Sequence, residues 1–256
     1  MIATRSYPIK RLFDITFSLG VLVAASPLLL GSMLAVWLLD FHSPFYKASR
    51  VARGGGDFTM MKVRSMVVNA AKTGVNSTGA NDSRITAVGR FIRRWKIDEL
   101  SQFLNVLSGS MSVVGPRPQV RHWGVDLYTD AEMQLLAVKP GITDLASIVF
   151  SDEGDILAGA AHADLEYNRI IRPWKSRLGL LYVDHMSLAL DIRVVWLTFL
   201  AIVNKQAAIY GVQAILRAHN ADPMLIEVCR RTAPLPVFAP PGSDVVEDGA
   251  KAGFTG

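Results

Sequence analysis

Cysteine and histidine are scarce in this chain. It has a single cysteine, Cys229, among 256 residues, so no internal disulfide can form and an oxidising compartment is not needed. The five histidines are scattered and form no cluster with zinc-ligand spacing, so a structural zinc site is not expected. Internal repeats are also absent. At this length the chain can bury a sizeable core and form one or two domains.

The overall charge is modest and positive. Half of the residues are hydrophobic and the mean hydropathy is positive, which is high for a soluble protein. The formal net charge is +5. A basic excess of this size fits a nucleic acid, an anionic lipid surface or a phosphorylated substrate, and composition alone does not choose among the three.

Formal charge is missing altogether from residues 15–39. This apolar stretch is long enough to cross a bilayer as one helix, for which about 20 apolar residues suffice. Its flanks argue against a simple crossing, because Lys10 and Arg11 precede it and Lys47 and Arg50 follow it. Positive charge marks the cytoplasmic side of a membrane segment, and here both ends are positive.

Ser26 and Pro27 lie in the middle of this stretch. Proline lacks the backbone donor, so we expect a kink there, and the Ser26 hydroxyl can satisfy a freed carbonyl within lipid. The simplest geometry is a re-entrant hairpin that enters the bilayer, turns at Ser26 and Pro27, and leaves on the same face. An ordinary kinked transmembrane helix is favoured by hydropathy alone. A secretory signal is a further alternative, although Pro27 disfavours cleavage.

The remaining chain mixes strand and helix patterns. Alternation and glycines predict a short β-hairpin over residues 45–66. A helix is expected over about 86–96, with arginines gathered on one face, and another begins near Asp98. Further helices are expected over 130–138, 161–181 and 187–203, the last of them interfacial, and the tail is expected to be disordered from about Thr232.

Asp98 and Glu99 stand side by side at the start of a predicted helix. An isolated acidic pair in this position is usually a helix cap. Here the nearby arginines outnumber the two carboxylates and could balance a diphosphate. A carboxylate can attack phosphorus to give an acyl phosphate, and its neighbour can help to hold Mg²⁺, which prefers oxygen ligands. The arginines are Arg84, Arg90, Arg93, Arg94 and Arg117.

An ordered series of motifs resembles the bacterial sugar transferases, the small monotopic phosphoglycosyl transferases that act on polyprenyl phosphate. The series covers roughly residues 8–203. It comprises 10–14 (KRLFD), Ser26 with Pro27, 62–66 (KVRSM), 82–86 (DSRIT), 88–93 (VGRFIR), 97–107 (IDELSQFLNVL), 111–118 (MSVVGPRP), 140–143 (PGIT), and the late Tyr182, Ser187 and Asp191.

The resemblance implies a fold and an activity. The fold would be α+β and predominantly helical, a monotopic membrane protein with an N-terminal re-entrant helix-break-helix hairpin and interfacial amphipathic helices. The enzyme would transfer a phosphosugar from a UDP-sugar to polyprenyl phosphate, expected to be undecaprenyl phosphate, through a covalent aspartyl intermediate. UMP would be released and synthesis of a surface glycan or exopolysaccharide would begin. The expected place is the bacterial inner membrane, with the catalytic domain facing the cytoplasm.

The resemblance also assigns roles to residues. Asp98 would be the nucleophile, Glu99 would complete the catalytic dyad and bind Mg²⁺, and Ser26 and Pro27 would form the membrane break. Membrane lipid is an expected partner, a homodimer is one assembly we consider, and nucleic acid is not expected. For Lys62 and the arginines other than Arg117, anchoring to anionic lipid is the alternative role. The implied substrate-binding residues are Lys62, Arg64, Arg90, Arg93, Arg117 and Asp191.

We expect a membrane hairpin over 8–44, a catalytic domain over 45–203 and a C-terminal extension over 204–256. The sequence departs from the family pattern at 144–147, which reads DLAS in place of Gly-Leu-Ala-Gln, and at Ser101, which replaces a frequent proline. The first change bears on substrate preference or marks a subgroup. A catalytically inactive membrane scaffold of a glycan assembly complex is the alternative function, but both dyad residues are present.

Overall fold

The computed structural model describes residues 5–70, 82–122, 124–160 and 162–246. In this part of the chain the fold is predominantly helical, with two small two-stranded sheets, as the α+β expectation requires. The helices are α1 (Lys10–Asp40), α2 (Ala87–Arg94), α3 (Ile97–Leu100), α4 (Gln102–Ser108), α5 (Leu145–Val149), α6 (Glu153–Ile156), α7 (Ala163–Glu166), α8 (Arg172–His185), α9 (Leu188–Val203), α10 (Lys205–Ala218) and α11 (Pro223–Val228). The strands are β1 (Phe45–Val51), β2 (Asp57–Val63), β3 (Ser112–Val114) and β4 (Gly141–Thr143). Short 3₁₀ segments are η1 (Arg53–Gly55), η3 (Val125–Leu127) and η4 (Glu132–Ala137), and η5 (Tyr167–Ile171) is a π-helical turn.

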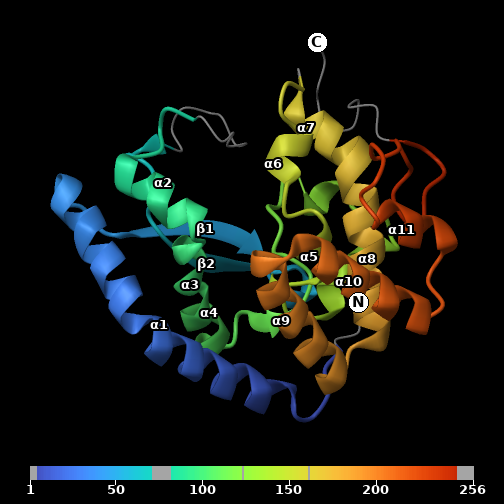
Figure 1. The fold of residues 1–256 in the computed structure, drawn as a ribbon, viewed down its shortest axis with the longest axis horizontal. Coiled ribbons are helices and arrows are strands. Elements are labelled where there is room, and N and C mark those ends of the chain that lie inside the picture. The colour runs from blue at the N-terminus through green and yellow to red at the C-terminus, as the bar shows by residue number, and fades with distance from the viewer. Residues whose placement is uncertain (1–4, 71–81, 123, 161, 247–256) are drawn as a thin grey trace.

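Helix α1 runs beneath both halves of the molecule (Figure 1). On one side, α2, α3, α4 and the β1–β2 hairpin lie against it, and on the other side α5 to α11 form a helical bundle. The main hydrophobic core lies in this bundle and extends to β3 and α4. A second, smaller core joins the later half of α1 to β2, α2 and α3.

The two sheets differ in direction. Strands β1 and β2 are antiparallel and are joined through η1, so the predicted hairpin over 45–66 is confirmed. Strands β3 and β4 are parallel, and Gly115, the residue after β3, approaches Gly141, the first residue of β4, so closely that only glycine fits. A Cβ added to Gly141 would lie 2.2 Å from the amide nitrogen of Gly115. This contact fixes the start of the Gly115–Pro118 turn.

Helix α1 continues through Pro27, so the structure has one bent helix where we expected two helices separated by a break (Figure 1). The missing N–H of Pro27 leaves the carbonyl of Val23 without its helical donor. The Ser26 hydroxyl donates to that carbonyl at 2.8 Å, which is the satisfaction expected from the sequence. This compensation explains why the helical path survives the proline.

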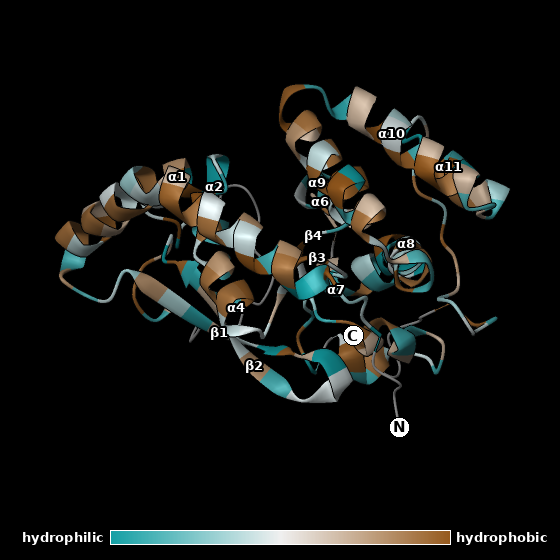
Figure 2. Ribbon diagram, turned by 90° about the horizontal axis from the view of Figure 1, so that it is seen from below, coloured by the Kyte–Doolittle hydropathy of each residue, from teal (hydrophilic) through white to brown (hydrophobic). Residues whose placement is uncertain are grey.

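The surface of α1 is apolar and largely uncovered. The helix is long and apolar enough to cross a membrane, and only 17% of its most apolar 18-residue window is buried. Figure 2 shows the hydrophobic residues distributed along most of its length. Helix α9 also exposes one apolar face, through Ile192, Trp196 and Phe199. Both surfaces are compatible with contact to lipid.

The later sequence predictions have mixed outcomes. The helix expected over 86–96 is α2, and its Thr86 N-cap accepts a hydrogen bond from the Gly89 amide at 2.9 Å. Within 130–138, Glu132–Ala137 forms the 3₁₀ helix η4, and within 161–181 the chain is helical from Ala163 onward, as α7, η5 and the first part of α8. Disorder was expected from about Thr232, yet Pro236 and Phe238 contact Trp174 of α8, and the Pro241 carbonyl accepts a hydrogen bond from Thr129. The ring centroids of Phe238 and Trp174 lie 4.8 Å apart. The proline-rich tail thus packs an aromatic side chain against an apolar surface of α8.

Candidate active site

Asp98 and Glu99 occupy the short helix α3, directly after a sharp turn. Lys96 has a positive φ of 52°, which ends the path of α2 and redirects the chain into α3. A positive φ is uncommon for residues other than glycine. The acidic pair therefore begins a new helical segment, as the sequence predicted, and the side chain of neither residue caps α3.

Helices α3 and α4 are held against the free edge of strand β2 by two side chains. Asn105 accepts a hydrogen bond from the Met61 amide at 2.9 Å and donates one to the Thr59 carbonyl at 2.8 Å. The Ser101 hydroxyl, which is fully buried, donates to the Met61 carbonyl at 3.1 Å. A proline in place of Ser101 could not form this bond. The two residues fix the position of Lys62, the next residue of β2, opposite the acidic pair.

The acidic pair faces two cations. The Lys62 Nζ lies 3.9 Å from Asp98 Oδ2 and 3.9 Å from Glu99 Oε1. The Arg117 guanidinium donates to Glu99 Oε1 at 2.5 Å. The side chains of Asp98 and Glu99 are 14% and 20% exposed, so both carboxylates can still be reached from outside. Lys62 and Arg117, both assigned to substrate from the sequence, therefore do meet the dyad.

The two carboxylates have opposite electrostatic environments. Burial raises the pKa of Asp98, and the charge of Lys62 only partly offsets this effect. Burial also acts to raise the pKa of Glu99, but the charges of Arg117 and Lys62 outweigh it and lower that pKa to about 2. Burial lowers the pKa of Lys62, against the opposing charge of Glu99. A permanently charged Glu99 beside a more basic Asp98 divides the pair into an anchored and an available carboxylate.

Asp98 is the available member. Its oxygens receive no side-chain hydrogen bond from the described residues, whereas Glu99 is bonded to Arg117. The Glu99 Oε2 atom also receives none from them. One Asp98 oxygen can therefore approach an electrophile without first breaking a hydrogen bond.

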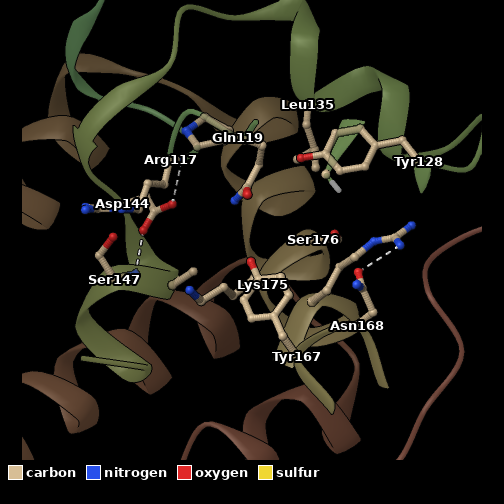
Figure 3. Close-up of a pocket in the computed structure, with 14 residues that line it drawn as sticks. Arg117, Gln119, Tyr128, Leu135, Asp144, Ser147, Tyr167, Asn168, Lys175 and Ser176 are labelled. Atoms are coloured by element: carbon tan, nitrogen blue, oxygen red, sulfur yellow. Dashed lines mark hydrogen bonds between the residues drawn. The ribbon is translucent and has the colours of Figure 1, made fainter. Parts of the chain in front are cut away.

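The backbone of Arg117 is fixed by a residue at which the sequence departs from the family. Asp144 accepts hydrogen bonds from the Arg117 amide at 3.1 Å and from the Ser147 amide at 2.5 Å, as the N-cap of α5. Figure 3 shows Asp144 between Arg117 and Ser147. The changed residue thus joins the arginine turn to α5 instead of weakening the site.

A narrow cavity lies beside Arg117 (Figure 3). Its volume of about 30 Å³ has room for only a few waters, so a larger ligand requires side chains to move. Its wall includes Lys175, which pairs with Glu153 and lies 5.4 Å above the Tyr167 ring. The cavity is also lined by Gln119, Tyr128 and Asn168. Sequence reasoning did not single out these residues, which share no motif: Gln119 lies in the loop before η3, Tyr128 directly follows η3, Asn168 is in η5 and Lys175 is in α8.

Three other predicted substrate residues, Arg64, Arg90 and Arg93, form no hydrogen bond or ion pair with Asp98 or Glu99 among the described residues. The charge of Arg93 only partly opposes the burial that raises the pKa of Asp98, and the Arg93 Nε donates to Ser65 Oγ at 2.9 Å. Arg64 forms a two-pronged pair with Asp40 at the end of α1, at 2.5 and 2.7 Å. Arg90 donates weakly to the carbonyl of Ile85 at 3.4 Å. Among the described residues, none of these arginines forms an ion pair with Asp98.

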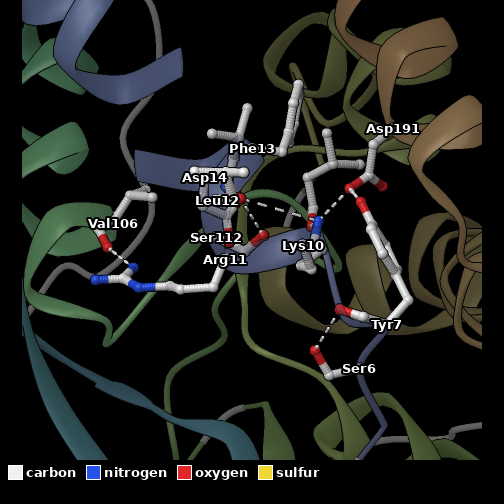
Figure 4. A network of polar contacts seen from close by, with 12 residues as sticks. Ser6, Tyr7, Lys10, Arg11, Leu12, Phe13, Asp14, Val106, Ser112 and Asp191 are labelled. Atoms are coloured by element: carbon white, nitrogen blue, oxygen red, sulfur yellow. Dashed lines mark hydrogen bonds and ion pairs between the residues drawn. The ribbon is translucent and has the colours of Figure 1, made fainter. Parts of the chain in front are cut away.

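Asp191 lies in a separate, buried network (Figure 4). It is fully buried and pairs with Lys10, while Tyr182 donates to its Oδ1 at 2.7 Å and Tyr7 to its Oδ2 at 2.5 Å. In the same network Asp14 accepts a hydrogen bond from the Val113 amide at 3.0 Å. These contacts join the start of α1 to β3, α8 and α9. Asp191 is thus placed to hold the fold together.

Sequence reasoning missed Arg50 as a member of the active-site charges. The charge of Arg50 acts with that of Arg117 to lower the pKa of Lys62, after the larger effect of burial. Arg50 lies on β1, opposite Phe58 of β2, whereas Lys62 is opposite Tyr46, so the β-hairpin places Arg50 on the strand next to that of Lys62 but not in its cross-strand pair. In the sequence, Arg50 was interpreted only as one of the basic residues that follow the apolar stretch 15–39, which does not indicate this role.

The described residues supply only some of the ligands that a Mg²⁺ ion needs. The described residues contain no cluster of three or more His, Cys, Asp and Glu side chains. Asp98 and Glu99 nevertheless each keep an oxygen that receives no side-chain hydrogen bond from them. Mg²⁺ is commonly held by one or two carboxylates together with waters and substrate phosphates. The pair therefore suits an ion that arrives with, or is completed by, a phosphorylated substrate.

Comparison with known proteins identifies a family. A family model described as bacterial sugar transferase matches residues 5–205. The chain is 35% identical over 199 residues to the UDP-N-acetylgalactosamine-undecaprenyl-phosphate N-acetylgalactosaminephosphotransferase of Aeromonas hydrophila, covering 76% of this chain and 44% of the relative. It is 37% identical over 191 residues to the uncharacterized sugar transferase EpsL of Bacillus subtilis, covering 74% and 85%.

A third relative is the UDP-glucose:undecaprenyl-phosphate glucose-1-phosphate transferase of Escherichia coli, 37% identical over 206 residues, with 78% of this chain and 41% of the relative covered. The chain thus spans less than half the length of the Aeromonas and Escherichia relatives and most of the Bacillus one.

Proposed function

Because this chain belongs to the bacterial sugar transferase family, we propose that it transfers a phosphosugar from a UDP-sugar to polyprenyl phosphate. The single observation that carries the proposal is the pairing of an open carboxylate, Asp98, with an anchored one, Glu99, between Lys62 and Arg117. The activities for which the Aeromonas and Escherichia relatives are named support the same reaction class. Undecaprenyl phosphate is the acceptor that we propose.

In the first step, an Asp98 oxygen attacks the phosphorus that carries the sugar. A new bond forms between this oxygen and phosphorus, the phosphorus–oxygen bond to the nucleotide breaks, and UMP leaves with that electron pair. In the second step, a phosphate oxygen of the acceptor attacks the same phosphorus and the Asp98 carboxylate is released. Arg117 and Lys62 are placed to offset the negative charge of the diphosphate.

Glu99 would hold Mg²⁺, together with phosphate oxygens of the substrate. The ion would supply charge neutralisation at the phosphate oxygens. Arg117 and Lys62 already keep Glu99 ionised at neutral pH, so this carboxylate is ready to bind a cation.

UMP release tests the proposal directly. The full chain in detergent or nanodiscs is given undecaprenyl phosphate and each member of a panel of UDP-sugars, and UMP is measured. We expect UMP release with at least one UDP-sugar. Release should continue over many turnovers only when the lipid acceptor is present. The inactive scaffold remains the second candidate, and absence of UMP with every sugar in a well-folded preparation would favour it.

We further propose that α1 is re-entrant in the bacterial inner membrane, with the catalytic part in the cytoplasm. Its support is the positive charge at both ends, the proline within the helix and the bent course of α1 in Figure 1. Ser6 and Ser49 are exposed and flank α1. Cysteine at either site, in a Cys229→Ser background, should be equally shielded from a membrane-impermeant thiol reagent in intact cells. Labelling of one site alone would show a true span and reject the hairpin.

A further inference from the structure

An apolar groove of about 560 Å³ runs between the later half of α1 and helix α2. Figure 1 shows α2 beside this half of α1. No charged residue lines the groove among the described part of the chain. Its walls include Pro27, Leu28, Gly31 and Ala35 from one face of α1, and Ala87 and Phe91 from α2.

Small residues keep the groove open. A Cβ added to Gly31 would meet nothing within 4 Å, so the space in front of this glycine is empty of protein atoms. Leu28 and Phe91, at 47% and 51% exposure, form apolar sides that no other described residue covers. Such a surface is costly to leave in water and is suited to an apolar chain.

The groove is joined to the catalytic pair through the smaller hydrophobic core. Val88 lines the groove and packs against the core that contains Ile97, the residue before Asp98. Leu29 and Val36, on the protein-facing side of α1, belong to the same core. Helix α2 also packs against α3, the helix that carries Asp98. One helix therefore forms a wall of the groove and contacts the helix that holds the reacting carboxylate.

We infer that this groove holds the isoprenyl chain of the lipid acceptor while its phosphate lies at Asp98. The inference rests on the proposed function and adds the place where the acceptor chain binds. The acceptor phosphate must reach a carboxylate that is held in the protein, so the first part of its chain must leave the bilayer beside α1. The groove offers an uncharged path at that point, and Gly31, Ala35 and Ala87 leave room for a methyl-branched chain.

The test fills the groove from one side. Gly31→Leu places a side chain in the empty space, and Ala35→Leu, one turn later on the same face, is a second variant. Gly20→Leu is the matched control, because it makes the same change on the same helix, also with nothing within 4 Å, but outside the groove. Both glycine replacements raise helix propensity equally. UMP release is measured with undecaprenyl phosphate and with geranyl phosphate, a much shorter acceptor.

We expect Gly31→Leu and Ala35→Leu to raise the KM for undecaprenyl phosphate roughly tenfold. The KM for the UDP-sugar and the kinetics with geranyl phosphate should change little, and Gly20→Leu should behave as wild type. Equal effects on both acceptors, or no difference between the Gly31 and Gly20 variants, would overturn the inference. If the KM changes of the variants depend on which phospholipid is supplied and not on the length of the acceptor, the groove binds ordinary acyl chains. If even the wild type releases no UMP with any acceptor, the proposed function itself fails.

Discussion

Asp191 and Asp98 both face a lysine, but their surroundings differ in almost every other respect. Asp191 is fully buried, and its two oxygens are occupied by Lys10, Tyr7 and Tyr182. Asp98 is 14% exposed, lies 3.9 Å from Lys62, and receives no side-chain hydrogen bond from the described residues. A carboxylate saturated by neighbours stabilises the fold, whereas one held near a cation with open oxygens can react. The comparison separates structural from chemical aspartates among residues that all belong to family motifs.

The sharpest test of this comparison is the same substitution at both aspartates. Asp98→Asn should abolish UMP release with an unchanged melting temperature, because the amide keeps the shape but loses the nucleophilic charge. Asp191→Asn should instead destabilise the protein by about 3–5 kcal/mol, since it removes the nearer carboxylate of the buried Lys10 and leaves only Asp14, at 4.0 Å, to balance that charge. Thermal unfolding in detergent and UMP release on both variants give the answer. Normal turnover by a folded Asp98→Asn protein would refute the covalent mechanism.

Metal removal should also distinguish the two clusters. Chelation with EDTA should abolish UMP release, and added Mg²⁺ should restore it, because a diphosphate near two carboxylates needs a cation. The melting temperature without substrate should hardly change, since the Asp191 cluster has no oxygen left for a metal. Full activity in exhaustive chelator would leave Arg117 and Lys62 as the groups that neutralise the diphosphate.

Arg117 and Arg64 allow the same comparison between a residue at the acidic pair and one away from it, with a smaller expected loss of activity. Arg117→Ala should reduce kcat/KM about tenfold to a hundredfold, as expected for a lost charged hydrogen bond of roughly 1.5–3 kcal/mol. Arg117→Lys should recover part of this loss, because lysine keeps the charge but not the planar fork. Arg64→Ala is the matched control, since Arg64 bonds to Asp40 and not to the dyad. An equal kinetic loss in a stable Arg64 variant would place Arg64 at the substrate after all.

The smallest expected effect concerns pH. The pKa of Asp98 is raised by burial and partly restored by Lys62, so Lys62→Met should raise it further. Asp98 attacks only when ionised, and activity is lost as the pH falls through its pKa. The acid limb of the kcat profile should therefore move to higher pH in Lys62→Met. Glu99, with a pKa of about 2, should not contribute to that limb. An unmoved limb would mean that Asp98 and Lys62 are not coupled in the working enzyme.

The sequence was informative where a cause lies within a few residues. The bond from Ser26 to the Val23 carbonyl follows from the missing N–H of Pro27, and the hairpin follows from alternation and glycines. The helical start at Asp98 was also predictable from its apolar stripe. The continuation of α1 past Pro27 was not, because local compensation by Ser26 lets one bent helix persist instead of two.

The pairing of charges was decided only by tertiary structure. Glu99 meets Arg117, 18 residues later, because Ser101 and Asn105 dock α3 and α4 on β2 and because Asp144 holds the arginine turn. Arg64 instead meets Asp40, 24 residues earlier, at the end of α1. By itself the sequence determined the membrane-length apolar helix, the acidic pair and the family to which they belong. Which of its many cations serve the acidic pair depended on the packing of helices against strands, since a flexible charged side chain pairs with whichever carboxylate the fold brings near.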